Sequence, residues 1–317
     1  MTRTTGTAPG GGPALVAVAH GSRDPRARAT VTALLTRVRA LRPWLDVRLG
    51  HIELDAPLID ATLADLGGGP GGPGGLGAPR GPGGRGDLEE PLIGATPAGL
   101  RGDLGGPGDP DTLRGPGGSG DAVLVPLLLS RGHHVKHDLP RALAGAPHLR
   151  GTVADPLGPH PLLAEALAAR LAEAVRPGGG RGSGYRSGSG YGDAVVLAAA
   201  GSRDPDSARD TRRTAALLSA RLGGVPVLPG YVSAVSPTVP EAVARLAARG
   251  ARRIAVASCF TAPGLFAERA AADAPWLVSA PLGAHDAMVR LLLHRYDQAR
   301  LRAFGAPRRD AALPTPA

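Results

Sequence analysis

Three side chains in the first half of the sequence are of the types that hold a transition-metal ion or accept protons. His20, Glu53 and His134 each stand at or just after the end of a short apolar run. Two imidazoles and a carboxylate form a borderline-soft ligand set that suits Fe, Co, Ni or Zn. The residues are far apart in sequence, so the prediction of a metal site depends on a fold that brings the ends of the three runs together.

The second half of the chain repeats the first without these side chains. The segment Val16–Pro25, which contains His-Gly-Ser-Arg-Asp-Pro, recurs as Val196–Pro205, which contains Ala-Gly-Ser-Arg-Asp-Pro. Ala200 thus stands where the first copy has His20. An apolar run and a Gly-Ser-Arg-Asp-Pro turn kept in both copies indicate a requirement of the fold, whereas the loss of the histidine indicates a loss of chemistry.

The other two candidates are lost in the same way. Continued in register, the repeat places Ser233 opposite Glu53 and Phe266 opposite His134. The joint loss of three ionisable residues favours a catalytic or metal-binding role for the first copy.

Both halves alternate apolar strand-length runs with amphipathic helical patterns. The predicted strands are Leu15–Ala19, Val47–Glu53, Ala122–Leu128 and Gly151–Ala154, then Ala194–Ala199, Val225–Val232, Ile254–Cys259 and Leu277–Ala280; predicted helices include Arg26–Leu41, Pro161–Val175, Ser207–Leu222, Pro240–Arg249 and His285–Ala303. Continuous apolar strands between helices predict an α/β fold with parallel sheets covered on both faces. We expect two tandem three-layer domains related by internal duplication, with a cleft in which ligands bind at the carboxyl ends of the strands.

Composition divides the chain into segments. We expect an N-terminal domain at 14–176, interrupted at 67–120 by a Gly/Pro-rich insertion with too little apolar surface to order itself, and a degenerate C-terminal domain at 193–304. The stretches 1–13 and 305–317 are predicted to be flexible ends, and 177–192 a linker.

Composition also limits the setting and the partners. The net charge of +9 and pI of about 10.9 favour acidic ligands, which include polycarboxylates and nucleic acids. Cys259 is the only cysteine, so no disulfide framework exists and a reducing cytoplasm is expected. The apolar runs are too short to span a membrane, and the first residues have no signal-peptide core.

The order of these motifs resembles the sirohydrochlorin chelatases of the class II type, known as CbiX and SirB, which insert Fe²⁺ or Co²⁺ into a tetrapyrrole. The resemblance rests on His-Gly-Ser-Arg-Asp-Pro after the first strand, Glu53 at the second, Pro-Leu-x4-Gly-x-His-x3-Asp-Leu-Pro at 126–140, and a later Pro-Leu-Gly-x-His. It implies that His20 and His134 are metal-site histidines and that Glu53 is their acidic partner. It also implies a metal chelatase, a lyase of sirohaem or cobalamin biosynthesis, with the metal as substrate and no organic cofactor.

Several other residues have two interpretations. Arg23 and Arg203 could bind the carboxylates of a tetrapyrrole or serve the scaffold. Ser22 and Ser202 are interpreted as helix N-caps. Asp138 could orient a histidine, but a capping role is favoured.

Four further side chains are interpreted as lying outside the chemistry. His160 and His285 occur in both copies before a helix, which favours a structural role. Lys136 and His137 are expected to be exposed.

Two alternative functions remain open. One is a metal or tetrapyrrole carrier without turnover. The other, less favoured, is nucleic-acid binding through the Arg/Gly/Tyr-rich tract at 181–192. The sequence leaves iron and cobalt both possible, and it indicates no oligomeric state.

Overall fold

The computed structural model describes residues 12–66, 120–175 and 192–305. The insertion, the linker and the two end segments predicted from the sequence fall almost wholly outside these residues. So does nearly all of the Arg/Gly/Tyr-rich tract.

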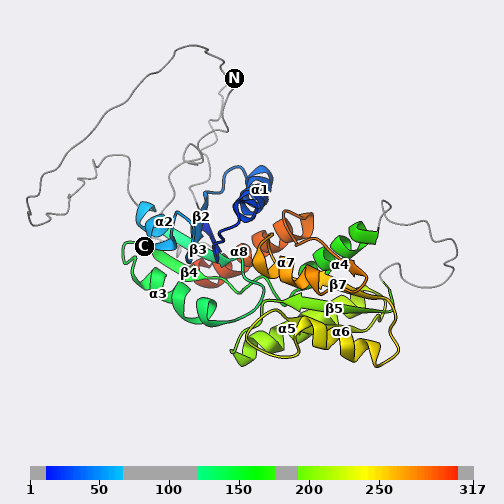
Figure 1. The fold of residues 1–317 in the computed structure, drawn as a ribbon. Helices are drawn as coiled ribbons and strands as arrows, with labels where there is room; N and C mark the ends of the chain where they lie inside the picture. Colours follow the sequence, from blue (N-terminus) through cyan, green and yellow to red (C-terminus); the bar gives the residue numbers. More distant parts are fainter. Residues whose placement is uncertain (1–11, 67–119, 176–191, 306–317) are drawn as a thin grey trace, which may run out of the picture. The chain divides into compact units, whose positions relative to one another are not determined.

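The first half forms a four-stranded parallel sheet with the strand order β2-β1-β3-β4 (Figure 1). Its elements are β1 (Ala14–Ala19), α1 (Pro25–Leu41), β2 (Val47–His51), α2 (Ile59–Asp65), β3 (Asp121–Pro126), the π-helical turn η2 (His134–Asp138), α3 (Leu139–Ala144), β4 (Arg150–Val153) and α4 (Pro161–Val175). β2 ends at His51, so the prediction that Glu53 ends this strand was wrong by two residues.

The second half repeats this topology as β6-β5-β7-β8. Its elements are β5 (Ala194–Ala199), α5 (Pro205–Arg221), β6 (Val227–Tyr231), α6 (Val239–Ala247), β7 (Ile254–Ser258), α7 (Leu265–Ala272), β8 (Leu277–Val278) and α8 (Asp286–Phe304). The predicted α/β class with two tandem parallel sheets is confirmed.

The alternation of side chains along each strand explains the three layers. In β1, Leu15 and Ala17 face one hydrophobic cluster, while Val16 and Val18 face another with α2 and α3. β5 behaves the same way, with α6 and α7 on its second face. The central strands β1, β3, β5 and β7 are therefore buried on both faces, as expected for continuously apolar strands.

The last helix of each half packs on the sheet of the other half. α4 contacts β7 and β8 of the second sheet, and α8 contacts β3 and β4 of the first. Figure 1 shows α4 beside β7. One hydrophobic cluster consequently contains side chains of α1, α4, α5 and α8 and of both sheets. The halves therefore share a core on this side.

The helix after the Gly-Ser-Arg-Asp-Pro turn begins in the same way in both halves. The carboxylates of Asp24 and Asp204 are the N-caps and accept hydrogen bonds from the N–H of Arg26 and Asp206. The prediction that the serines cap was wrong: each serine Oγ instead accepts the N–H of the aspartate two residues later. The turn is retained because it starts the helix.

The free thiol of Cys259 is buried, and burial raises its pKa to about 12. In the described part of the chain, no helix is both long enough and apolar enough to cross a membrane.

Candidate metal centre

Two loops that follow neighbouring strands are held side by side at the edge of the first sheet. The N–H of Ile52 donates to the Ala19 carbonyl at 2.9 Å, and that of Glu53 to the His20 carbonyl at 3.1 Å. Gly21 makes this approach possible, since a Cβ there would lie 1.7 Å from the Glu53 carbonyl oxygen and its φ is +99°. The repeated glycine therefore sets His20 beside Glu53.

The structure brings the three predicted residues together. Nε2 of His20 lies 3.2 Å from Oε1 of Glu53, and the rings of His20 and His134 meet edge to face with centroids 4.9 Å apart. One potential ligand atom from each of the three residues lies within 4.8 Å of the others, and within the described chain this is the one such cluster of three or more metal-binding side chains. His20 and Glu53 are about half exposed, so an ion or a macrocycle can reach them.

Asp138 orients His134. Its Oδ2 lies 2.6 Å from Nδ1 of His134, and its carboxylate makes no capping hydrogen bond to α3. The capping role favoured for Asp138 was therefore wrong. An ionised carboxylate can only accept, so Nδ1 of neutral His134 carries the proton and Nε2 is left with a free lone pair for a metal ion.

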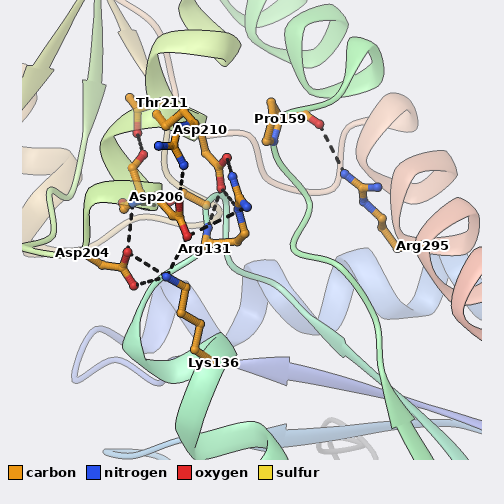
Figure 2. Close-up of polar contacts among 11 residues, drawn as sticks. Arg131, Lys136, Pro159, Asp204, Asp206, Asp210, Thr211 and Arg295 are labelled. Carbon is orange, nitrogen blue, oxygen red and sulfur yellow. Dashed lines mark hydrogen bonds and ion pairs between the residues drawn. The ribbon is translucent and has the colours of Figure 1, made fainter.

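The loop that carries His134 is anchored to the second half of the protein. Figure 2 shows the guanidinium of Arg131 bonded to the carboxylate of Asp210 and the amine of Lys136 bonded to Asp204 and Asp206. The Arg131 nitrogens donate to the buried Asp210 at 2.6 Å and 2.9 Å, and Lys136 Nζ donates to each of the other two carboxylates at 2.9 Å. These hydrogen bonds raise the pKa of Lys136, which is exposed as predicted. The second copy has lost the reactive side chains, yet it holds one of them in place.

The cluster opens on a cavity of about 990 Å³. His20 and His134 line it on the side of the first half, and the apolar side chains of Leu127, Leu129 and Phe266 also line it. Glu53 contacts His20 from beyond the lining residues. A cavity of this size and composition suits a large, flat, partly apolar ligand.

The second half presents the pseudo-equivalent positions without chemistry. Ala200 and Phe266 line the cavity, while the hydroxyl of Ser233 donates to the Ala200 carbonyl at 2.9 Å. A Cβ added at Gly201 would lie only 2.0 Å from the carbonyl oxygen of Ser233, so the close backbone approach of the first half is repeated here. The ionisable groups of the first half are therefore replaced, at the equivalent positions, by side chains that do not ionise.

The two predicted substrate-binding arginines differ in position. Arg23 lines the cavity, whereas Arg203 is exposed outside its lining. Arg28, on the first turn of α1, also lines the cavity and was missed by the sequence reasoning. Among described residues, neither Arg23 nor Arg28 forms an ion pair, in contrast to Arg26, which pairs with Asp24.

The structural role predicted for His160 and His285 is confirmed. Nδ1 of His285 accepts the N–H of Ala287 as the N-cap of α8, and Nδ1 of His160 accepts the N–H of Leu162 at the start of α4. Burial, with Arg295 and His294 nearby, lowers the pKa of His160 to about 4.

His51 is a further buried histidine that the sequence did not single out. It lines the cavity, and its Nδ1 lies 3.3 Å from the Pro57 carbonyl. Burial lowers its pKa, so it is neutral in the folded protein near pH 7.

The structure thus has a duplicated parallel α/β fold with two histidines and a glutamate clustered at one strand edge, and comparison with known proteins gives its family. The model of the CbiX family matches residues 14–68, 112–174 and 194–299. These stretches make up more than half of the chain, so the chain belongs to the CbiX family.

Solved structures share the fold. SirB from Bacillus subtilis with Fe³⁺ matches at 20% identity and a TM-score of 0.59, over 93% of this chain and 98% of that one. SirB from Bacillus subtilis subspecies spizizenii, in complex with cobalt, matches at 20% identity and a TM-score of 0.58, over 92% of this chain and 96% of that one. CbiX, described as the terminal enzyme for biosynthesis of siroheme in denitrifying bacteria, matches at 19% identity and a TM-score of 0.52, over 90% of this chain and 99% of that one. A comparison with curated sequences found no match. The predicted resemblance to this family is confirmed.

Proposed function

We propose that this protein is a sirohydrochlorin chelatase that inserts Fe²⁺ or Co²⁺ into a tetrapyrrole. The observation that carries the proposal is the cluster of His20, Glu53 and His134 at the mouth of the cavity, in a chain of the CbiX family. The metal is a substrate, and the chain's own residues supply the ligands and the bases.

The geometry of the two imidazoles suits a cation held between them. With metal–nitrogen bonds of ~2.1 Å and a nitrogen–metal–nitrogen angle of about 90–110°, two imidazole rings have their centroids about 4.5–5.2 Å apart. The His20 and His134 centroids, at 4.9 Å, fall inside this interval. Ligands on ~2.1 Å bonds are at most ~4.2 Å apart, so a spread of up to 4.8 Å among the three ligand atoms is slightly too wide for a tight three-ligand site. A loosely held ion suits a protein that must give it up.

Insertion also requires acceptors for two pyrrole N–H protons. His20 and Glu53 are in contact through Nε2 and Oε1, so a proton taken by the imidazole is stabilised by the adjacent carboxylate. An imidazole titrates near neutral pH, and it binds a metal only when deprotonated. When the metal leaves His20, the imidazole nitrogen that held it therefore becomes free to accept a proton.

The cavity walls explain how a flat polycarboxylate could be seated. Leu127, Leu129 and Phe266 offer apolar contact to the macrocycle, and Arg23 and Arg28 offer charge to its carboxylates. The net charge of +9 favours the approach of such an anion. The same reasoning covers a carrier without turnover, which differs from an enzyme only in product formation. We place the protein in the cytoplasm, in keeping with its single buried thiol.

The test is anaerobic insertion of each metal, followed by the absorbance of the metallated macrocycle. The wild-type protein is expected to turn over, and His20→Ala, His134→Ala or Glu53→Gln to lower kcat/KM, by at least ~100-fold for the histidines. His285→Asn, a cap far from the chemistry, is the matched control for a lost imidazole. Near-normal turnover by His20→Ala would overturn the assignment, and stoichiometric binding without turnover by the wild type would make the protein a carrier.

A further inference from the structure

Two more imidazoles stand next to the cluster and take no part in it. His133 and His137 are exposed, and their rings are tilted with centroids 4.7 Å apart. They are four residues apart around the π-helical turn η2, a spacing that puts two side chains on one face of a helix. Their separation lies in the interval of about 4.5–5.2 Å that two imidazoles on one metal ion require.

This pair connects to the proposed insertion site through other imidazoles. The His133 ring lies 6.4 Å from that of His134, which in turn lies 4.9 Å from that of His20. Asp138 contacts both His134 and His133. Its Oδ2 lies 2.6 Å from Nδ1 of His134, and its Oδ1 lies 3.8 Å from Nε2 of His133. Four imidazoles thus form a continuous series from exposed His137 to His20, and within it His133, His134 and His20 line the cavity.

The turn that carries the pair is held in place independently of any metal. Lys136, the only lysine of the chain, lies between the two histidines in sequence and is hydrogen-bonded to Asp204 and Asp206 of the second half (Figure 2). The N–H of Arg131 also donates to the buried carboxylate of Asp210 at 2.9 Å. The backbone under His133 and His137 is therefore preorganised, which lowers the entropic cost of binding an ion there.

We propose that His133 and His137 form a second divalent-metal site, a surface loading site from which the cation passes to His134 and His20. The passage to an insertion site rests on the proposed function, whereas the binding of metal by the pair does not. Two imidazoles, completed by water, give a weak and labile site. Such a site raises the local concentration of metal beside the cavity and exchanges its ion quickly.

The binding test uses Co²⁺ alone, titrated anaerobically into the full-length protein and followed by calorimetry and by paramagnetic broadening of histidine NMR signals. In His20→Ala/His134→Ala, which lacks the cavity ligands, Co²⁺ binding is expected to persist and to broaden the signals of His133 and His137. Adding His133→Asn/His137→Asn should abolish this binding. His148→Asn is the matched control, because His148 is an exposed histidine whose Nε2 contacts the Leu63 carbonyl instead.

The kinetic test uses His133→Asn/His137→Asn in the otherwise intact protein. The KM for Co²⁺ should rise at least ~3-fold while kcat at saturating metal changes much less, as expected for loss of a local reservoir. Complete loss of Co²⁺ binding in His20→Ala/His134→Ala would overturn the second site and leave the proposed function standing. Persistent surface binding with an unchanged KM would overturn its loading role. Absence of insertion by the wild type would instead refute the proposed function, and the Co²⁺ titration would still decide the site.

Discussion

Asp138→Asn is the sharpest test of how the site is held. The carboxylate contacts Nδ1 of His134 at 2.6 Å and caps no helix, so its loss should affect the imidazole more than the fold. An amide can still accept a hydrogen bond, but it loses the charge that makes such a contact about twice as strong as a neutral one. Substitutions of this kind behind a metal ligand typically cost ~10–100-fold in metal affinity or activity.

The expected effect is therefore a fall of ~10–100-fold in kcat/KM for the metal, or about 1.4–2.7 kcal/mol in the free energy of activation. It should appear in anaerobic insertion kinetics with the metal varied at saturating macrocycle, together with weaker Co²⁺ binding. The KM for the macrocycle should stay nearly constant, because Asp138 is not among the residues that line the cavity.

The matched control is Asp121→Asn. Asp121 begins β3 and pairs with the exposed guanidinium of Arg150, so its loss should cost little stability and leave insertion unaltered. If Asp138→Asn lowered the melting temperature while kcat/KM for the metal stayed normal, Asp138 would be a structural residue and the reasoning would be refuted.

Two further predictions concern charge. Arg23→Ala should raise the KM for the macrocycle roughly twofold to fivefold, the scale of an exposed ion pair, and flatten the salt dependence of this KM. Arg203→Ala should have a smaller effect on both, because Arg203 lies outside the cavity lining. Equal effects of the two substitutions would contradict this placement. His160→Ala should lower stability at pH 7 by ~1 kcal/mol through loss of the cap, without changing kcat. The folded pKa of about 4 lies below the unfolded value of ~6.5, so the wild type binds fewer protons folded than unfolded and loses stability as pH falls through this interval. Thermal melts at pH 7 and pH 5 should therefore show a smaller difference for the variant, and an unchanged difference would exclude His160 as the source.

The sequence by itself determined the repeat, the α/β class and the identity of the candidate ligands. Internal duplication made this possible, because Gly21 and Gly201 are kept for a close backbone approach that both halves need, whereas His20 has no counterpart in the second copy. Strands buried on both faces are apolar throughout, so their positions could be read within one or two residues at most ends.

The tertiary structure decided what depends on contacts between distant segments. The side chains of Asp138 and Ser22 instead bond within their own turns, and the backbone conformation of these turns, which the residue types alone do not show, selects those contacts over helix capping. α4 packs on the sheet of the second half and α8 on the sheet of the first. The sequence of these helices does not show this exchange, because an apolar helix face is the same whichever sheet covers it. Likewise, nothing in the local sequence shows that Lys136 pairs with the Asp204 that caps the helix of the other half. Local patterns fix which surfaces are buried and which residues can react, but partners across the molecule are chosen by the complementarity of whole surfaces.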